Sequence, residues 1–276
     1  MKKPFAKKSF GQNFLVDAHY IDKIIGVLDP QTGETIIEIG AGRGALTEKL
    51  IESGADVLAI ELERDMIAVL KERFGKAENF RLVESDALKI DFSELVNPKS
   101  EIQTSKSAKL IANLPYYIST AILQKLIVQR TVFSEMILMF QREVVERITA
   151  QIGNSERGFL SVLAQNYLET EQLFDVPPKA FRPSPKVTSA VARLTPKSDV
   201  KTENDKLFRA VVSTAFTQKR KTIFNNLKNA APELSEKFGD VSQLLANCNI
   251  EPVRRAETLT IDEWNCLVNS ICERKN

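Results

Sequence analysis

The sequence predicts an α/β protein with a mainly parallel sheet, followed by a small all-α region. Over the first two thirds of the chain, β-branched or apolar runs alternate with amphipathic stretches, the pattern of strands joined by crossover helices. After a polar stretch at 195–205, the apolar positions recur only at helical spacing. At 276 residues the chain can bury one large core and one smaller core, and we place the boundary between residues 198 and 199.

Composition and charge exclude several classes of protein. No apolar run is long enough to cross a bilayer, and the first residues lack the apolar core of a secretory signal, so we expect a cytoplasmic protein without membrane contact. Cys248, Cys266 and Cys272 have no partners at metal-binding spacing, so we expect reduced thiols and no metal site. His19, the only histidine, has no G-x-S-x-G motif beside it, which disfavours a triad hydrolase.

A glycine-rich turn follows the first predicted strand of the sheet. Residues 35–39 are β-branched and run into Gly40-Ala41-Gly42-Arg43-Gly44, then into a helix at 46–53. Glycines in such a turn let a ligand approach the backbone close to a helix N-terminus. The next strand, at 56–60, ends in Glu61, where a Rossmann-like unit places an acid on a ribose diol. We therefore expect a ligand that contains adenosine.

Two cofactors fit this turn. Gly40, Gly42 and Ala45 satisfy the dinucleotide pattern G-x-G-x-x-G/A, but Glu38 lies two residues before the first glycine. A carboxylate there suits the cationic methionine end of S-adenosylmethionine better than a pyrophosphate, although it could also be an ordinary hydrogen-bond acceptor. The sequence favours S-adenosylmethionine over NAD.

Two later strands also end in polar residues. The strand at 80–84 ends at Asp86, whose carboxylate could bind the exocyclic amine of adenine or merely cap the next turn. An apolar run at 110–112 is followed by Asn113-Leu114-Pro115-Tyr116 and a helix at 119–128. Because parallel strands end at one edge of a sheet, we expect these groups to meet the glycine turn.

The tetrapeptide Asn113-Leu114-Pro115-Tyr116 can hold a flat ring that carries an amine. The Asn113 amide oxygen and the Leu114 carbonyl can accept the two amine hydrogens, Pro115 makes the turn rigid, and Tyr116 offers a face for stacking. In isolation the same four residues could be a proline turn with a core tyrosine.

The remaining elements are less informative. The sequence predicts helices or strands at 17–28, 135–140, 157–167 and 187–194, and a proline-rich loop that begins at 174. In the C-terminal region it predicts helices at 207–216, 222–228, 241–248 and 261–271. The last begins with a capping box, Thr260 and Glu263, and we expect Trp264 in the core.

Three basic segments could meet phosphates: Lys2 to Lys8, the loop with Lys179, Arg182 and Lys186 beside Phe181, and Lys219-Arg220-Lys221. Each could instead be a solvated surface, as most charge runs are.

Taken together, the motifs resemble the KsgA type of small-subunit ribosomal RNA adenine dimethyltransferases, with the erythromycin-resistance methylases of large-subunit RNA as near relatives. The matching stretches cover most of the chain: Phe10-Gly11-Gln12-Asn13-Phe14-Leu15, Glu38 to Gly44, Asn113 to Tyr116 with Ile118-Ser119-Thr120, Phe181 to Val187 with Ser189-Ala190-Val191, and Ala215-Phe216 with Gln218 to Thr222.

The resemblance implies a Rossmann-like class I methyltransferase domain at 1–198 and a helical RNA- or ribosome-binding domain at 199–276. It implies dimethylation of N6 of two adjacent adenosines in a hairpin loop near the 3′ end of small-subunit (16S) ribosomal RNA, with S-adenosylmethionine as donor. The implied partner is an immature small ribosomal subunit, and the protein would act as a monomer. The alternative is a large-subunit enzyme of the macrolide-resistance type.

The resemblance also assigns roles to single residues. The donor would be held by Asn13, Leu15, Glu38, Gly40, Gly42, Glu61, Asp86 and Asn113, with Glu61 on the ribose and Asp86 on the adenine. Asn113 to Tyr116 would be the catalytic turn. Tyr116 would stack on the target base, with Phe181 on the other face, and Lys219, Arg220 and Lys221 would contact RNA. Tyr117 departs from the family, where many members have asparagine, so the shape of the target pocket is open at this point.

The expected chemistry needs no general base. The lone pair on adenine N6 is delocalised into the ring, so catalysis should rest on positioning and on acceptors that localise that lone pair. The target base must leave its stack to reach the site. An RNA-binding factor on a degenerate methyltransferase fold is an alternative, but it would need damaged cofactor residues, and these look intact.

Overall fold

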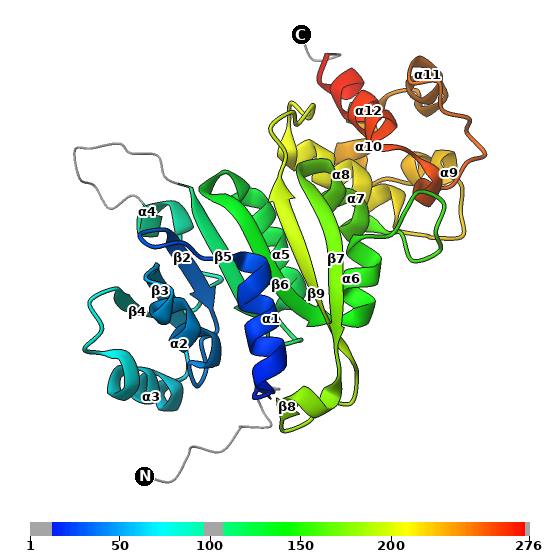
Figure 1. Cartoon of the computed structure of the whole chain (residues 1–276). Helices are drawn as coiled ribbons and strands as arrows, with labels where there is room; N and C mark the ends of the chain where they lie inside the picture. Colours follow the sequence, from blue (N-terminus) through cyan, green and yellow to red (C-terminus); the bar gives the residue numbers. More distant parts are fainter. Residues whose placement is uncertain (1–12, 97–106, 274–276) are drawn as a thin grey trace. The chain divides into compact units, whose positions relative to one another are not determined.

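The computed structural model describes residues 13–96 and 107–273. The chain divides into two compact units: residues 1–145 with 169–196, and residues 146–168 with 197–276 (Figure 1). The predicted basic segment from Lys2 to Lys8 and the motif residues Phe10, Gly11 and Gln12 lie outside the described residues. Among those that are described, no helix has the length and apolar character that crossing a membrane requires.

The first unit is built on a seven-stranded sheet with the order β4-β3-β2-β5-β6-β9-β7. The strands from β4 to β6 pair in parallel, and β9 pairs antiparallel to β6. This arrangement confirms the predicted α/β fold of the Rossmann-like class. The strands are β2 (Thr35–Ile39), β3 (Asp56–Glu61), β4 (Phe80–Glu84), β5 (Ala108–Asn113), β6 (Phe133–Gln141), β7 (Leu168–Val176) and β9 (Ser189–Pro196).

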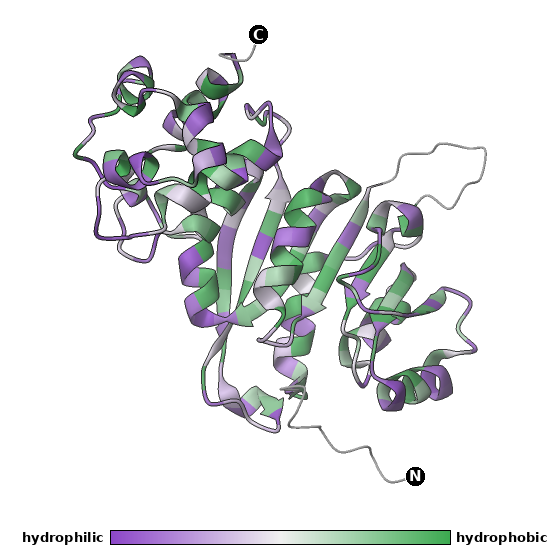
Figure 2. Cartoon of the chain, turned by 180° about the vertical axis from the view of Figure 1, so that it is seen from behind, coloured by the Kyte–Doolittle hydropathy of each residue, from purple (hydrophilic) through white to green (hydrophobic). Residues whose placement is uncertain are grey.

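Helices cover both faces of this sheet. On one face the side chains of Ile36, Val57 and Ile111 pack against α1 (Ala18–Leu28) and α2 (Ala45–Glu52). On the same face, Ala59 of β3 packs against α3 (Arg64–Phe74). Figure 1 shows α1 in front of the sheet, and Figure 2, seen from behind, shows α5 (Ser119–Val128) in front of it. The short helices α4 (Phe92–Val96) and α6 (Arg142–Ile148) follow β4 and β6.

The sheet reverses its winding between β2 and β5. From β2 the order runs to β3 and β4 on one side, and from β5 it runs to β6 on the other. Open α/β sheets bind ligands at this switch point, beyond the carboxyl ends of the strands. The glycine turn follows β2 and the Asn113 to Tyr116 turn follows β5, so both predicted motifs lie at the switch point.

The N-terminal segment pairs with the proline-rich loop. β1 (Phe14–Leu15) forms a two-stranded antiparallel sheet with β8 (Phe181–Arg182), in which Leu15 lies opposite Phe181. The backbone N–H groups of Val16 and Asp17 both donate to the carbonyl of Ala180. The described end of the N-terminal segment is therefore fixed to the loop that carries Phe181.

Several elements escaped sequence prediction, among them β7 and α10 (Pro232–Phe238). Strand β7 begins before the predicted loop and extends into it. The sequence did not indicate this strand, because apolar and polar residues alternate poorly in it and most of its side chains are exposed or half-buried at the end of the sheet. Helix α10 is short and buries only Phe238, so its apolar periodicity is weak.

The second unit is helical, with α7 (Phe159–Tyr167), α8 (Asp205–Ala215), α9 (Ile223–Lys228), α11 (Val241–Asn247) and α12 (Ile261–Glu273) besides α10. Trp264 is fully buried and stacks on Phe216 with the ring centroids 6.0 Å apart, as predicted for a core residue. The predicted capping box is present: Thr260 N–H donates to the Glu263 carboxylate at 2.6 Å, and Glu263 N–H donates to Thr260 Oγ1 at 3.1 Å.

Residues 146–168 belong to this second unit, although the division of the sequence at 198/199 leaves them in the first domain. The reason is long-range packing. Helix α7 contacts α8 and α12, and the buried Arg157 guanidinium donates to the carbonyls of Glu257 and Leu259. Contacts between residues so distant in sequence leave no local signal.

The expectation of three reduced cysteines was wrong. Cys248 and Cys266 form a disulfide with Cα atoms 5.7 Å apart, while Cys272 is free. Packing of α11 against α12 brings the two residues together, and their separation of 18 positions gave no hint of this contact.

Candidate functional site

The glycine turn after β2 adopts a backbone that only glycine tolerates well. Gly40, Gly42 and Gly44 have φ angles of 74°, 56° and 80°, in the left-handed region. A Cβ on Gly44 would lie 2.3 Å from the ring of Phe74, and one on Gly42 would lie 3.3 Å from the ring of Phe14. The turn is therefore fixed by packing on both sides, and its backbone is open to a ligand at Gly40.

Glu61, at the end of β3, is anchored by backbone donors. One carboxylate oxygen accepts the N–H of Gly42 at 2.9 Å, and the other accepts those of Leu62 and Glu63 at 2.8 and 2.9 Å. These three bonds fix the carboxylate beside the glycine turn. It retains capacity to accept from a diol, since two carboxylate oxygens offer about four lone-pair sites.

Glu38, next to the last residue of β2, is 2% exposed and accepts the hydroxyl of Thr47 at 2.6 Å. Burial, opposed by hydrogen bonding from Thr47 and reinforced by the nearby charge of Glu61, raises its pKa to about 7. The site therefore contains two carboxyl groups, one held by three backbone donors and one buried beside Thr47.

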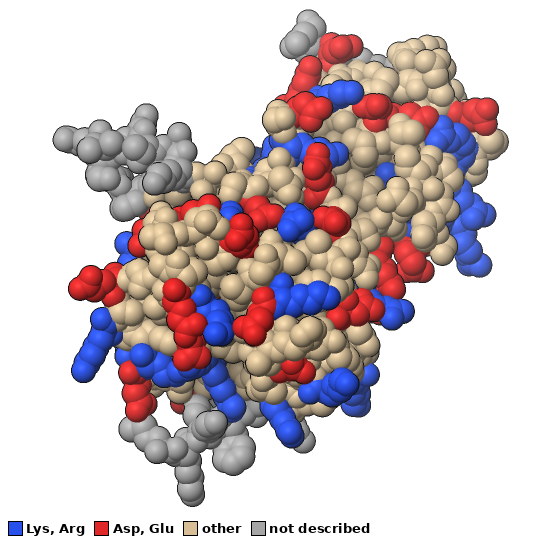
Figure 3. Space-filling view, viewed as in Figure 1, with Lys and Arg blue, Asp and Glu red and all other residues tan. Residues whose placement is uncertain are grey.

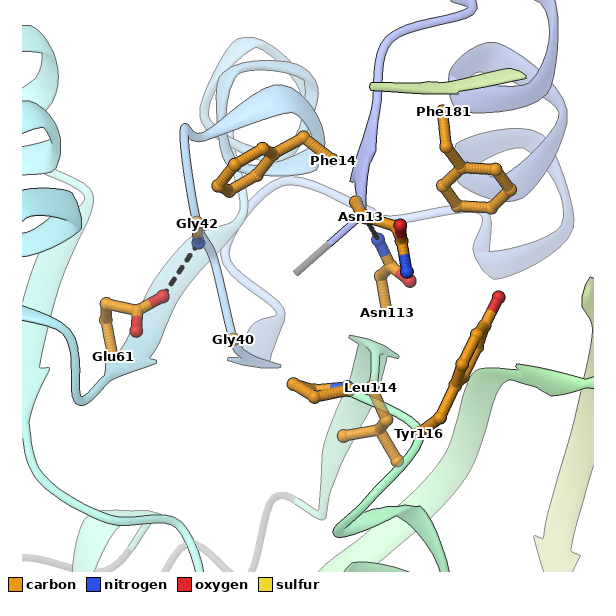
Figure 4. A pocket seen from close by; sticks show the side chains of 10 residues that line it. Asn13, Phe14, Gly40, Gly42, Glu61, Asn113, Leu114, Tyr116 and Phe181 are labelled. Atoms are coloured by element: carbon orange, nitrogen blue, oxygen red, sulfur yellow. Dashed lines mark hydrogen bonds between the residues drawn. The ribbon is translucent and has the colours of Figure 1, made fainter. Parts of the chain in front are cut away.

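Asn113, at the end of β5, connects the turn to the N-terminal segment. Its Nδ2 donates to the backbone carbonyl of Asn13 at 3.5 Å. With the amide nitrogen turned to Asn13, the amide oxygen is available to accept from a ligand. Figure 4 shows the Asn13 and Asn113 side chains side by side at the centre of the pocket.

Tyr116 and Phe181 form an aromatic wall. The Tyr116 hydroxyl lies 2.9 Å from Ser189 Oγ, and burial raises the pKa of the phenol, so the ring is neutral and held at its outer end. Phe181 is 2% exposed, and its ring lies beyond the Tyr116 hydroxyl (Figure 4). The neighbouring Tyr117 is 63% exposed, outside the pocket lining.

Most predicted site residues meet in one pocket. Its ten lining residues are Asn13, Phe14, Gly40, Gly42, Glu61, Asn113, Leu114, Pro115, Tyr116 and Phe181 (Figure 4). An adjoining hollow shares Phe14, Gly40, Gly42 and Asn113 with this pocket and is also lined by Leu15 and Glu38.

The other predicted residues lie elsewhere. The Asp86 carboxylate accepts the N–H of Leu88 at 2.9 Å, the capping role that the sequence left open, and it does not line the pocket. Lys219, Arg220 and Lys221 are exposed on the loop between α8 and α9 of the second unit. Figure 3 shows Lys and Arg side chains along the border of that unit near α9.

Two residues of this edge were not among the predicted site residues. Phe14 lines the pocket, and the Arg43 guanidinium lies over its ring at 4.3 Å from the centroid. Leu62 is 58% exposed directly after Glu61, where an apolar side chain can cover the face of a flat ring. The available signal for Leu62 was its position directly after Glu61.

Comparison with known proteins settles the family. A model of the ribosomal RNA adenine dimethylase family matches residues 5–266. The chain belongs to the ribosomal RNA adenine dimethylase family. It is 40% identical over 269 residues to ribosomal RNA small subunit methyltransferase A of Saccharophagus degradans, with 96% of this chain and 94% of the relative covered. It is 38% identical to the protein of the same name from Alkaliphilus oremlandii, with 97% and 92% covered.

Solved structures agree with this assignment. A dimethyladenosine transferase from Plasmodium falciparum superposes with a TM-score of 0.79 at 25% identity, covering 95% of this chain and 98% of that one. The 23S ribosomal RNA methyltransferase ErmE has the same fold, with a TM-score of 0.68 at 22% identity and coverage of 94% and 100%. The resemblance and the enzyme class predicted from sequence are confirmed: the chain is an adenine dimethyltransferase of ribosomal RNA, and S-adenosylmethionine is its methyl donor.

The pocket fits this donor by its chemistry. Its lining includes the Glu61 carboxylate and contains no Lys or Arg, and Glu38 adds a second carboxyl group in the adjoining hollow. A ligand with a sulfonium and an ammonium finds carboxyl acceptors there, and the nearby cations Arg43, Lys49 and Arg73 line the adjoining hollow but not the pocket itself. Within the described part of the chain, no group of three or more His, Cys, Asp or Glu side chains could hold a metal ion.

Proposed function

We propose that this chain transfers two methyl groups to N6 of each of two adjacent adenosines in a hairpin loop near the 3′ end of small-subunit (16S) ribosomal RNA. The relatives at 38–40% identity are named for the small subunit, which supports that RNA as substrate. The single observation that carries the proposal is the pocket itself. It joins the turn after β2, with Glu61, to the turn after β5, with Tyr116 and Phe181.

In this proposal the pocket has a donor half and a target half. Gly40, Gly42 and Glu61 hold the donor, with Glu61 on the ribose and Glu38 near the methionine end. Asn13 and Asn113 close the pocket between the halves. Leu15 supports this edge from the core, where it is 5% exposed, and Asp86 would reach the adenine with the carboxylate oxygen that does not accept from Leu88.

Transfer depends on how the target half presents adenine N6. The rings of Tyr116 and Phe181 hold the base, and the hydrogen bond from Tyr116 to Ser189 fixes the plane on which it stacks. The Asn113 amide oxygen and the Leu114 carbonyl accept the two N6 hydrogens, which localises the nitrogen lone pair. Pro115 fixes the direction of that carbonyl. The donor supplies an electrophilic methyl carbon with a thioether as leaving group, and N6 loses one proton to solvent as the new N–C bond forms, so the residues need only align the two reactants.

A second methyl group can follow on the same nitrogen, because N6 keeps one hydrogen after the first transfer. The pocket has to accept the first methyl group, and fresh donor has to bind. The base enters from a loop or as an extruded nucleotide, since N6 inside a stacked helix cannot reach the pocket.

The remaining parts of the proposal concern partners and place. The unit that carries the sheet acts as the methyltransferase domain, and the C-terminal helical region at 199–276 contacts an immature small ribosomal subunit. The side chains of Lys219, Arg220 and Lys221 are exposed, so they can contact RNA phosphates. This exposure supports an RNA-binding role for residues 199–276. The protein acts as a monomer in the cytoplasm.

The substrate is tested by mapping methylated adenosines. Undermethylated small and large subunits are incubated separately with the protein and labelled S-adenosylmethionine, and the modified positions are located in each RNA. We expect dimethylated adenosines in adjacent positions of the small-subunit RNA alone. Dimethylation on the large subunit alone would overturn the proposal in favour of the resistance-methylase reaction.

A further inference from the structure

The donor half holds two carboxyl groups, and the cations that line the adjoining hollow, Arg43, Lys49 and Arg73, form no ion pair with either of them. Among the described residues, neither Glu38 nor Glu61 forms an ion pair. The two are close enough for the charge of Glu61 to act on Glu38. Two like charges in a shared site disfavour each other, so one of the two groups is the preferred place for a proton.

The hydrogen bonds show which group that is. Glu61 accepts three backbone N–H groups, which are spread over both of its oxygens. Glu38 accepts only from Thr47 among the residues that the structure describes, and it is almost completely buried. Burial without a cation penalises the charged form, and the pKa of Glu38 is raised to about 7 by this burial, with the charge of Glu61 adding to it.

Other charged groups also line the adjoining hollow. They are Asp22 of α1, Arg43 of the glycine turn, Glu48 and Lys49 of α2, and Asp65, Glu72 and Arg73 of α3. Arg73 pairs with Glu48, and Lys49 pairs with Glu52, which lies outside the lining. Of all charged groups, only Glu61 is a cause of the shifted pKa of Glu38.

We propose that Glu38 carries a proton in the free protein and releases it to solvent when the cationic methyl donor binds. The step is balanced: the carboxyl O–H bond breaks, the proton goes to the buffer, and the carboxylate stays in the protein opposite the new positive charge. The proposal rests on the proposed donor site, because the sulfonium and ammonium have to enter the hollow that Glu38 lines. A cation within about 4–6 Å lowers the pKa of a carboxyl group by 1–3 units.

The consequence is a preference for donor over product that depends on pH. S-adenosylmethionine has one more positive charge than S-adenosylhomocysteine, so the donor gains more from the ionised form of Glu38. Below pH 7 the proton competes with the donor, and donor affinity falls by up to about tenfold per pH unit. Above the pKa of Glu38 in the free protein, donor affinity levels off. The affinity of the product changes much less over the same range.

The test is isothermal titration calorimetry of the unmodified protein in buffers with different enthalpies of ionisation. The dependence of the measured heat on the buffer gives the number of protons released. At pH 6.0 we expect roughly 0.4–0.9 proton released with S-adenosylmethionine, for a pKa lowered by 1–3 units. We expect a clearly smaller release with S-adenosylhomocysteine, which keeps the ammonium but lacks the sulfonium charge, and the ligand α-amino groups add nothing because they titrate only near pH 7.7–8.0. At pH 8.0 release due to Glu38 should fall to about 0.1.

Variants assign the proton to Glu38. Glu38→Gln keeps an acceptor for Thr47, and we expect it to abolish proton release at pH 6.0 and to remove the pH dependence of donor affinity. Glu84→Gln is the matched control, because Glu84 ends β4 of the same sheet but is exposed and paired with Lys71. It should behave like the unmodified protein. Infrared difference spectroscopy of the unmodified protein adds a readout without a variant: donor binding should remove the signal of a protonated carboxyl group.

The outcomes separate this proposal from the proposed function. Donor binding without proton release at pH 6.0, or with equal release for donor and product, would overturn the proton proposal and leave the methyltransferase assignment standing. Failure of the unmodified protein to bind S-adenosylmethionine at all would overturn both.

Discussion

The donor half of the pocket is formed mainly by backbone groups, and the target half mainly by side-chain rings. In the donor half, Gly40 and Gly42 expose backbone, and the carboxylate of Glu61 is held by three backbone N–H groups. In the target half, Tyr116 and Phe181 present side-chain rings, and what holds each of them comes from a distant part of the chain. Backbone geometry follows from a short local sequence, whereas the position of a ring depends on packing between remote segments.

Asn113 belongs to both halves, so its loss should have the largest effect. Asn113→Ala removes the bond to Asn13 and the amide oxygen that we propose accepts from N6. We expect methyl transfer to undermethylated small subunits to fall by about 10²–10³-fold, the effect of losing one fixed polar group of an active site. RNA affinity should stay within about twofold, because most of it comes from phosphate contacts. Unchanged turnover would show that Asn113 takes no part in the transfer.

Glu61→Gln tests the donor half alone. The amide nitrogen that replaces one carboxylate oxygen cannot accept from a backbone N–H group, so the side chain loses its fixed position. Hydrogen bonds to charged groups contribute about 1.5–3 kcal/mol, and we expect the dissociation constant for S-adenosylmethionine to rise about 10- to 100-fold. Affinity for the target RNA without donor should not change. A matching loss of RNA affinity would mean that the two halves are not separate.

Tyr116→Ala is the corresponding test of the target half. Stacking on an aromatic side chain is worth about 1–3 kcal/mol per base, so kcat/KM for the RNA should fall by about 5- to 100-fold. Donor affinity measured by calorimetry should be unaffected. Tyr116→Phe, which keeps the ring, should recover most of the loss, and a Phe variant as poor as Ala would contradict a stacking role.

Ser189→Ala should have the smallest effect of the series. It removes the hydroxyl that holds the outer end of Tyr116 at 2.9 Å, and an ordinary hydrogen bond contributes about 1 kcal/mol. We expect kcat/KM to fall by about two- to sixfold, with Ser189→Thr closer to the unmodified protein. When Ser189→Ala is combined with Tyr116→Phe, kcat/KM should fall no further than in Tyr116→Phe alone. Full additivity of the two changes would show that Ser189 acts independently of Tyr116.

The same contrast explains what sequence could predict. Strands β2 and β4 have the predicted bounds, and the glycine turn, Glu61 and Asn113 meet as expected, because parallel strands bring their carboxyl ends to one edge. The bond between Tyr116 and Ser189 joins residues 73 positions apart, and no local pattern indicates it.

The other differences between the sequence prediction and the structure also arise from contacts between distant parts of the chain. Strand β7 is weakly amphipathic, so its place in the sheet depends on β9 and not on its own sequence. Residues 146–168 pack with the C-terminal helices through contacts such as Arg157 to Glu257, about one hundred positions away along the chain. The disulfide of Cys248 and Cys266 likewise depends on how α11 and α12 meet.

The most direct test of the pocket is the product that it makes. The unmodified protein and Asn113→Ala are each incubated with undermethylated small subunits and S-adenosylmethionine, and the nucleosides are then separated and identified by mass. We predict N6,N6-dimethyladenosine from the unmodified protein and almost none from the variant. Methylation of another atom of adenine, or equal amounts of dimethyladenosine from both proteins, would contradict the placement of N6 at the turn from Asn113 to Tyr116.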